Sequence, residues 1–198
     1  MMLTDLIPLL LFTVSTSLTP GPNNFMLLNA GLNYGVKKSL GLYLGICLGF
    51  PLMVLVVALG FGEVFIHYPL LKQVLKILGS AYMLYLAWQI FSSDAKLKSE
   101  HARKPLHFFK AMLFQWINPK AWLMAIGAIS MFTIMSNPFQ NALIISGLFF
   151  LVCLPCLGVW LIFGALLQKI LKEEWHRRLF NALMALGLVA SVVMIFFD

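Results

Sequence analysis

Residues 19–24 read Thr-Pro-Gly-Pro-Asn-Asn, and they interrupt a largely apolar stretch that runs from residue 6 to residue 32. A proline removes one backbone hydrogen bond from a helix and clashes with the preceding turn, which costs about 3 kcal/mol or more. In lipid, the carbonyl groups freed by such a break need partners within the protein or in a wet cavity. If the chain spans a membrane, this segment is therefore a candidate for a functional break in a membrane helix.

The composition indicates an integral membrane protein. Of the 198 residues, 61% are hydrophobic and 11% are charged, whereas soluble domains carry about 25% charged residues. Residues 39–62, 142–168 and 179–197 contain no Asp, Glu, Lys or Arg, and each range reaches the roughly 18–20 residues that a helix needs to cross a bilayer. The N-terminus lacks the basic segment of a cleaved signal peptide, so we expect a retained first span.

We expect an all-α polytopic fold with six transmembrane helices in a single transmembrane domain, residues 1–198. A polar loop at about residues 92–109 separates a first repeat, about 1–91, from a second repeat, about 110–198. The expected spans are approximately residues 5–32, 40–64, 69–91, 110–135, 140–167 and 178–197.

The basic residues predict the orientation in the membrane. The net charge is +7, and eleven of the fourteen Lys and Arg residues fall in the loops between spans 1 and 2, 3 and 4, and 5 and 6. The positive-inside rule places these loops in the cytoplasm and both termini outside, in the cell inner (plasma) membrane. Because the charges lie in short loops without interleaved aromatic residues, no nucleic-acid partner is predicted.

A second break, Asn118-Pro119-Lys120, follows Lys110 by about ten residues, which is roughly 15 Å along a helix. Its depth in span 4 matches that of the first break in span 1. Matched breaks three spans apart predict two inverted three-helix repeats. Pro51 and Pro155, which we expect to kink spans 2 and 5, agree with this arrangement.

The two breaks also predict a binding site. Pro22 and Pro119 suit the first positions of new half-helices, the second capped by Asn118. Each half-helix directs free N–H groups and a positive dipole end towards the bilayer centre, where they can hold one anion such as an amino-acid carboxylate. Inverted repeats with discontinuous helices are typical of secondary transporters. The expected substrate-binding residues are Pro20, Gly21, Pro22, Asn23, Asn24, Asn118, Pro119 and Lys120.

Lys120 is the only charged side chain expected near the middle of the membrane, which makes it a functional candidate. It could bind a substrate carboxylate and exchange a proton during the transport cycle, or it could instead cap carbonyl groups freed by the breaks. Asn23 and Asn24 suit the polar groups of a zwitterion, or they repair the backbone around the prolines. No Asp or Glu lies deep in a span, so no carboxylate relay is indicated.

With these motifs, the sequence resembles the lysine exporter / threonine–homoserine exporter (LysE/RhtB) family of amino-acid efflux proteins, essentially from end to end. The similarity rests on Thr-Pro-Gly-Pro-Asn-Asn, on LGSAYMLYLAW at 78–88 and on FFKAMLFQWINPKAW at 108–122. The family often has Asp after Pro-Gly-Pro, and Asn23 instead resembles the subgroup that exports cysteine and O-acetylserine. The resemblance implies efflux of small neutral or polar amino acids or their derivatives, including homoserine or threonine, driven by the proton gradient. We expect such an antiporter to work by alternating access.

Two alternatives stay open. Cys153 and Cys156 form a CxxC motif with Pro155 inside a span, which a transmembrane thiol–disulfide electron carrier could use, although buried cysteines are commonly just small apolar residues. A passive channel is the other alternative. No enzymatic motif, cofactor or metal site is predicted, and the expected partners are an amino-acid substrate and the lipid bilayer. Gly41, Gly45 and Gly49 form a stripe that favours close helix packing within the protomer, with a homodimer left open.

Overall fold

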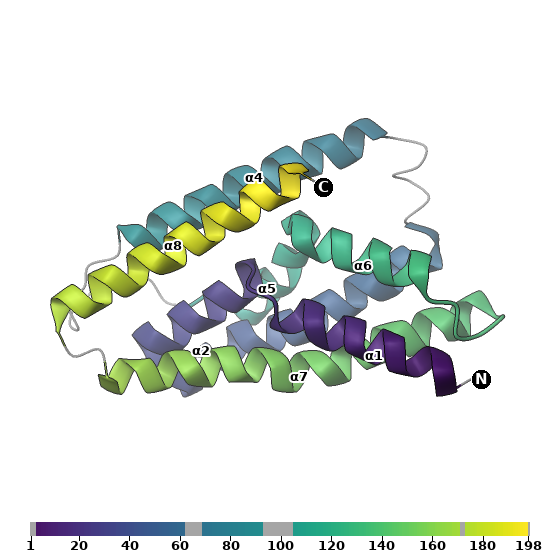
Figure 1. Ribbon diagram of the computed structural model, residues 1–198, viewed down its shortest axis with the longest axis horizontal. Helices are drawn as coiled ribbons and strands as arrows, with labels where there is room; N and C mark the ends of the chain where they lie inside the picture. Colours follow the sequence, from purple (N-terminus) through teal and green to yellow (C-terminus); the bar gives the residue numbers. More distant parts are fainter. Residues whose placement is uncertain (1–2, 62–68, 93–104, 171–172, 198) are drawn as a thin grey trace.

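The computed structural model describes residues 3–61, 69–92, 105–170 and 173–197, and all regular secondary structure in these ranges is helical (Figure 1). The predicted all-α class is therefore confirmed. The predicted loop at about 92–109 lies mostly outside the described residues. The helices are α1 (Leu3–Leu18), α2 (Pro22–Val56), the π-helical η1 (Val57–Phe61), α4 (Pro69–Phe91), α5 (Phe108–Phe114), the 3₁₀ turn η2 (Gln115–Ile117), α6 (Pro119–Met131), α7 (Pro138–Ile170) and α8 (Glu174–Phe197).

Helix α2 consists of two arms that meet at Gly35. Gly35 has φ 73° and ψ 173°, a backbone conformation that glycine adopts without the steric penalty of a side chain. The sequence predicted a loop at about residues 33–39 between spans 1 and 2, and this prediction is wrong. One glycine makes the turn, and Lys37 and Lys38 lie exposed in the first turn of the second arm.

Helix α7 packs against both arms of α2. In the first arm, Leu28 lies against Gly164 and Gly31 against Leu161 and Ala165 of α7. In the second arm, Tyr43 donates a hydrogen bond to the Leu154 carbonyl and the Pro51 carbonyl accepts one from Ser146, each at 2.7 Å. The second arm is therefore antiparallel to α7.

Helix α1 runs parallel to α7, because Phe12 packs on Phe149 while Ser17 lies against Cys153. Phe12 also packs on Phe132, just beyond the end of α6, and Lys120 at the start of α6 reaches Pro20. Helix α6 is therefore antiparallel to α1. Both relationships follow from two contacts at different heights along each helix.

The glycine stripe of α2 packs within the protomer, as the sequence favoured. Side chains at Gly45 and Gly49 would collide with Phe108, Ala111 and Met112 of α5. This contact makes α5 parallel to the second arm of α2. Together with α1, α6 and α7, these helices enclose the main hydrophobic core, which includes Ile46, Met53, Ala125, Ile145 and Phe149.

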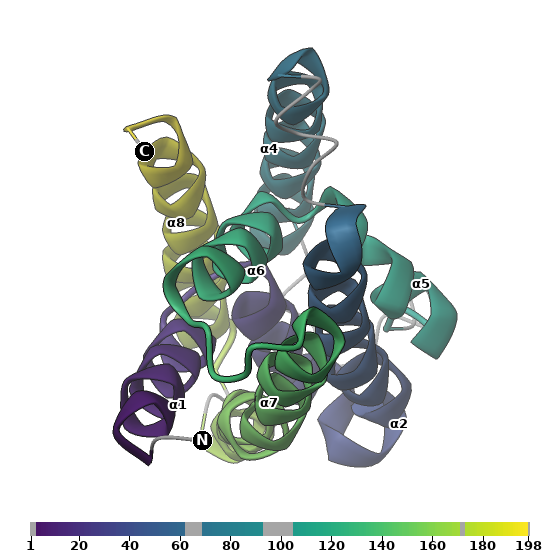
Figure 2. The same ribbon diagram turned by 90° about the vertical axis from the view of Figure 1, so that its right-hand side faces the viewer.

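Helices α4 and α8 form an antiparallel pair beside this bundle (Figures 1 and 2). Gly79 of α4 packs against Ile117 and Pro119 at the second break, and Gly187 of α8 packs against Phe25 beside the first break. Phe25 joins the pair to the bundle through a small cluster with Ala87, Ile90, Ala185 and Leu188. Each break is thus covered by one helix of the pair.

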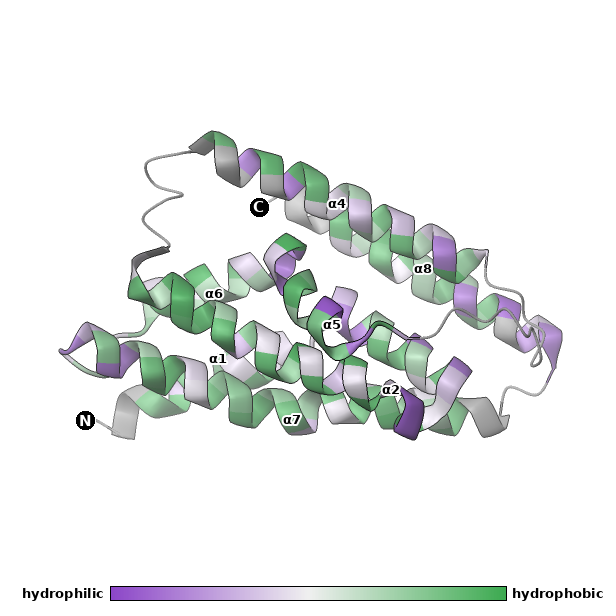
Figure 3. Ribbon diagram, turned by 180° about the vertical axis from the view of Figure 1, so that it is seen from behind, coloured by the Kyte–Doolittle hydropathy of each residue, from purple (hydrophilic) through white to green (hydrophobic). Residues whose placement is uncertain are grey.

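The outer surface of the helices is apolar. Leu40, Leu44, Leu48 and Leu52 follow one another at four-residue spacing on α2, and each is more than 40% exposed. In Figure 3, hydrophobic residues dominate along the helices, and hydrophilic ones gather at the start of α8, near the turn of α2 and at the α6–α7 connection. By length and composition alone, Pro22–Gly60 and Pro138–Leu167 qualify as membrane-spanning stretches, while Leu6–Leu18 and Phe108–Ile117 are shorter apolar helices.

Candidate functional site

The first break separates α1 from α2. Helix α1 ends at Leu18, and α2 begins with Pro22 in its first turn, as predicted. Gly21 is fully extended, with φ −175° and ψ −179°, and caps α2 without a side-chain hydrogen bond. A Cβ atom at Gly21 would lie 2.6 Å from Cδ of Lys120, so a residue without a side chain lets Lys120 approach the backbone.

The second break separates α5 from α6 and is held together by Asn118. After the 3₁₀ turn Gln115–Ile117, Asn118 adopts extended angles of φ −85° and ψ 106°. Its side-chain oxygen accepts a hydrogen bond from the Lys120 backbone N–H at 3.2 Å, and Pro119 occupies the first turn of α6. The predicted cap is confirmed. The backbone carbonyl of Asn118 also accepts hydrogen bonds from the N–H groups of Ala121 and Trp122, so these first N–H groups of α6 are already bonded.

Lys120 bridges the two breaks. Its ammonium Nζ donates to the carbonyl oxygen of Thr19 at 2.5 Å and to that of Pro20 at 3.2 Å. These carbonyls follow the last turn of α1, where a helix leaves acceptors without partners and carries a negative dipole end. Of the alternatives considered for Lys120, the structure shows the contact with carbonyl groups freed by the break.

A reciprocal pair of amides joins the breaks a second time. Asn23 donates from Nδ2 to Oε1 of Gln115 at 2.8 Å, and Gln115 donates from Nε2 to Oδ1 of Asn23 at 3.1 Å. Gln115 is fully buried and also donates to the carbonyl of Ala111. Asn24 donates to the Ser17 carbonyl at 2.9 Å and so ties α2 to the last turn of α1.

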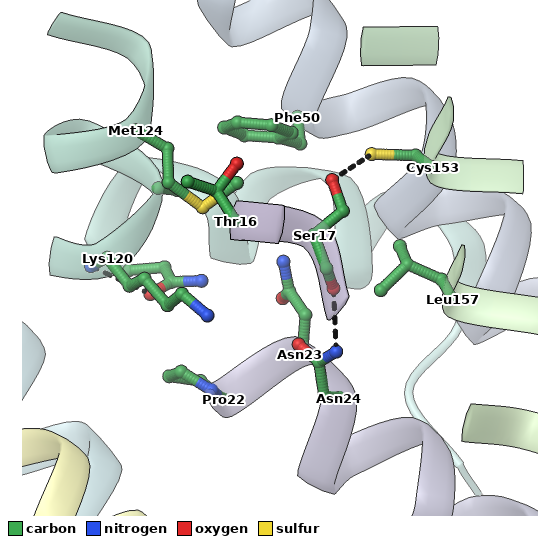
Figure 4. A pocket seen from close by; sticks show the side chains of 12 residues that line it. Thr16, Ser17, Pro22, Asn23, Asn24, Phe50, Lys120, Met124, Cys153 and Leu157 are labelled. Carbon is green, nitrogen blue, oxygen red and sulfur yellow. Dashed lines mark hydrogen bonds between the residues drawn. The ribbon is translucent and has the colours of Figure 1, made fainter. Parts of the chain in front are cut away.

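These residues surround a small cavity (Figure 4) of about 20 Å³, which is room for about one water molecule. Figure 4 shows Lys120 on one side and Cys153 and Leu157 on the opposite side, with Asn23 and Asn24 between them. Helices α1, α2, α6 and α7 all contribute. The lining residues are Thr16, Ser17, Pro22, Asn23, Asn24, Phe50, Asn118, Lys120, Ala121, Met124, Cys153 and Leu157.

Five of the eight predicted site residues line the cavity: Pro22, Asn23, Asn24, Asn118 and Lys120. Pro20 contributes a carbonyl oxygen to Lys120, and Gly21 admits the lysine side chain. Pro119 instead packs against Gly79 of α4. The starts of α2 and α6 therefore meet at one cavity. Because the first N–H groups of α6 are already bonded, α6 contributes its dipole to the cavity rather than free hydrogen-bond donors.

Sequence analysis gave Gln115 as a weaker candidate than Asn118, because it is a polar residue in an apolar segment about one turn before Asn118. Several other contributors to the site were missed. Thr16, Ser17, Phe50, Met124 and Leu157 gave no signal, because such residues are common in membrane helices and only their packing brings them to the cavity. Cys153 was considered for redox chemistry, and the structure places its sulfur 3.9 Å from the Ser17 hydroxyl at the cavity wall. All three cysteines are free thiols.

The family model described as LysE type translocator matches residues 14–197. The chain belongs to this family. It is therefore a membrane protein of a translocator family, and the resemblance noted from its motifs is confirmed.

Curated relatives share the family assignment. The chain is 34% identical over 195 residues to the cysteine/O-acetylserine efflux protein of Salmonella choleraesuis strain SC-B67, with 94% of each chain covered. It is 30% identical over 194 residues to the cysteine/O-acetylserine efflux protein of Escherichia coli strain K12, again with 94% of each covered. No solved structure matches the chain. The relatives are thus named for transport and not for catalysis.

Proposed function

We propose that this LysE-family protein is a secondary active transporter that exports small neutral or polar amino acids or derivatives of the cysteine, O-acetylserine, homoserine and threonine type. The observation that carries the proposal is the meeting of two half-helix N-termini and one lysine at a single cavity between the breaks. Relatives named as cysteine/O-acetylserine efflux proteins support the export direction and the substrate class.

The cavity lining favours an uncharged side chain on the substrate. In the described part of the chain, Lys120 is the one charged residue among the lining residues, and no carboxylate accompanies it. A substrate carboxylate would meet the Lys120 ammonium and the positive end of α2. A cationic side chain would add a second positive charge with no counter-ion, which is costly where water is scarce.

The contacts support an arrangement of six spans as two inverted triplets. In such an arrangement, contacts between spans 2 and 4 recur between spans 5 and 1. Gly45 in span 2 packs on Phe108 of α5, in span 4, and Gly164 of α7, in span 5, packs on Leu28 of the first arm of α2, in span 1. Likewise, span 3 covers the second break and span 6 covers the first, through Gly79 and Gly187. Side-chain hydrogen bonds between α2 and α7 reach the carbonyls of Pro51 and Leu154, which are at or next to the prolines expected to kink spans 2 and 5.

The size of the cavity supports a mechanism of alternating access. About 20 Å³ holds no amino acid, so a substrate can bind only if the bundle rearranges, and in the proposed mechanism it opens on one side and then on the other. The positive-inside rule supports both termini outside, in the inner membrane. In this orientation, export would run from the end that carries the turn of α2 to the end that carries the α6–α7 connection. Proton antiport would supply the driving force, with Lys120 as the group that could exchange the proton.

The test uses cells that overproduce the protein and purified protein in liposomes. Overproduction should raise the extracellular concentration of cysteine or O-acetylserine against a gradient, and a protonophore should abolish the accumulation. Downhill efflux that a protonophore leaves unchanged would indicate the passive channel instead. Absence of any amino-acid efflux in both systems would refute the proposal.

A further inference from the structure

The two carbonyl groups that follow α1 are occupied by an ammonium group of the protein itself. Nζ of Lys120 lies 2.5 Å from the Thr19 oxygen and 3.2 Å from the Pro20 oxygen. A primary ammonium carries three N–H donors and no acceptor. Two converging carbonyls at the negative end of a half-helix are well suited to such a group.

Three other acceptors beside the break are bonded to amide N–H groups of the protein. The Ser17 carbonyl accepts from Asn24, Oδ1 of Asn23 accepts from Gln115, and Oδ1 of Asn118 accepts from the Lys120 backbone. An amino-acid substrate also brings a primary ammonium, and the cavity lining described above holds no carboxylate to receive it. The carbonyls of Thr19 and Pro20 differ from these acceptors because the group they hold is itself an ammonium, that of Lys120, and a substrate ammonium could take its place.

The first break presents both dipole ends that a zwitterion needs. The carbonyls of Thr19 and Pro20 lie at the negative end of α1, and α2 starts immediately afterwards at Pro22 with its positive end. Lys120 and Pro22 both belong to the same cavity. An ammonium and a carboxylate attached to the same carbon atom, as in an α-amino acid, fit these two neighbouring groups.

We propose that the backbone carbonyls of Thr19 and Pro20 form the ammonium subsite of the substrate, and that the Lys120 side chain occupies this subsite until a substrate carboxylate draws it away. The inference rests on the proposed function, because it assigns the carboxylate of an amino acid to Lys120, which lines that cavity, and the ammonium to the carbonyls of Thr19 and Pro20, which lie beside the cavity and not in its lining. When the substrate binds, its ammonium replaces Nζ on the carbonyls, and Nζ pairs with the carboxylate.

The exchange explains how the site can select zwitterions. A zwitterion adds no net charge, so the cavity keeps one uncompensated positive charge before and after binding. A simple amine would bring a second ammonium beside Lys120 without a carboxylate to compensate it. The site should therefore reject amines even though it contains an ammonium subsite.

Lys120→Met tests the proposal, because methionine keeps an unbranched apolar chain and lacks the ammonium. Binding to purified protein is measured by calorimetry for cysteine, for cysteamine, which lacks the carboxylate, and for 3-mercaptopropionate, which lacks the ammonium. The variant should lose about tenfold or more in affinity for cysteine, because the charged hydrogen bond between Lys120 and the carboxylate is lost. It should gain about tenfold in affinity for cysteamine, because the carbonyls of Thr19 and Pro20 are no longer occupied. Lys110→Met, at an exposed lysine of α5, should match the wild type.

The opposite signs separate the proposal from a structural role for Lys120. Loss of affinity for both compounds, or an unchanged affinity for cysteamine, in a folded Lys120→Met protein would overturn the ammonium subsite while leaving amino-acid export intact as a function. Failure of the wild type to bind or export cysteine and O-acetylserine would instead overturn the proposed function.

A wild-type measurement decides the matter if Lys120→Met does not fold. Methylammonium should bind roughly fivefold or more tightly in the presence of saturating 3-mercaptopropionate, because the carboxylate removes Lys120 from the carbonyls first. If a wild-type protein that binds cysteine binds methylammonium and 3-mercaptopropionate independently of each other, the proposed displacement of Lys120 is refuted.

Discussion

The reciprocal amide pair between Asn23 and Gln115 should be one of the main ties between the two broken helices. Leucine at either position removes the pair, and Leu is close to both residues in size. Interhelical hydrogen bonds in membrane proteins contribute about 0.6 kcal/mol on average and about 1.7 kcal/mol at most. Two such bonds join these residues, so the expected coupling is about 1–3 kcal/mol.

A double-mutant cycle measures this coupling. The free energies of unfolding of the wild type, Asn23→Leu, Gln115→Leu and the double variant are determined by denaturation in mixed detergent micelles. The second leucine should cost less in the presence of the first, because its partner is already gone. As a control, Asn23→Leu and Ser146→Ala should be additive, since Ser146 bonds Pro51 and shares no partner with Asn23.

A coupling energy below about 0.3 kcal/mol, which is within the usual scatter of additive pairs, would refute the reasoning. It would mean that the two amides find other partners when separated. Of the side-chain hydrogen bonds described between the breaks, those of Lys120 would then remain. Export measured on the same variants shows whether the tie is also needed for transport.

Three further predictions follow from the site and the packing. Lys120→Ala should abolish export while the protein still inserts into the membrane, as judged by efflux and by the amount of protein in membranes; normal export would remove the lysine from the mechanism. A variant in which serine replaces every cysteine should keep exporting amino acids, whereas a thiol–disulfide carrier would lose all activity; the positions are Cys47, Cys153 and Cys156. Gly164→Val should cost about 3 kcal/mol or more, because a Cβ there meets the Leu28 carbonyl, while Gly147→Val, where a Cβ meets nothing within 4 Å, should barely change the melting temperature.

The loops illustrate the limits of sequence analysis. The segment around Lys37 and Lys38 was predicted to be a loop because charges leave the membrane there, and the charges are indeed exposed. The turn itself takes one residue, since Gly35 can adopt a positive φ. Periodicity and charge give the approximate place of such a turn, but its length depends on the backbone angles of one residue and on how the two arms pack against α7.

The sequence by itself determined the helical class, the two breaks, the helix-starting prolines and the Asn118 cap, because these depend on composition and on local backbone chemistry. Only the tertiary structure decided that Lys120 bonds the carbonyls of Thr19 and Pro20, that Asn23 pairs with Gln115, and that Cys153 and Leu157 face the same cavity. Residues about one hundred positions apart meet there through the packing of four helices. No local propensity encodes such a meeting, since it depends on which faces of these helices come together.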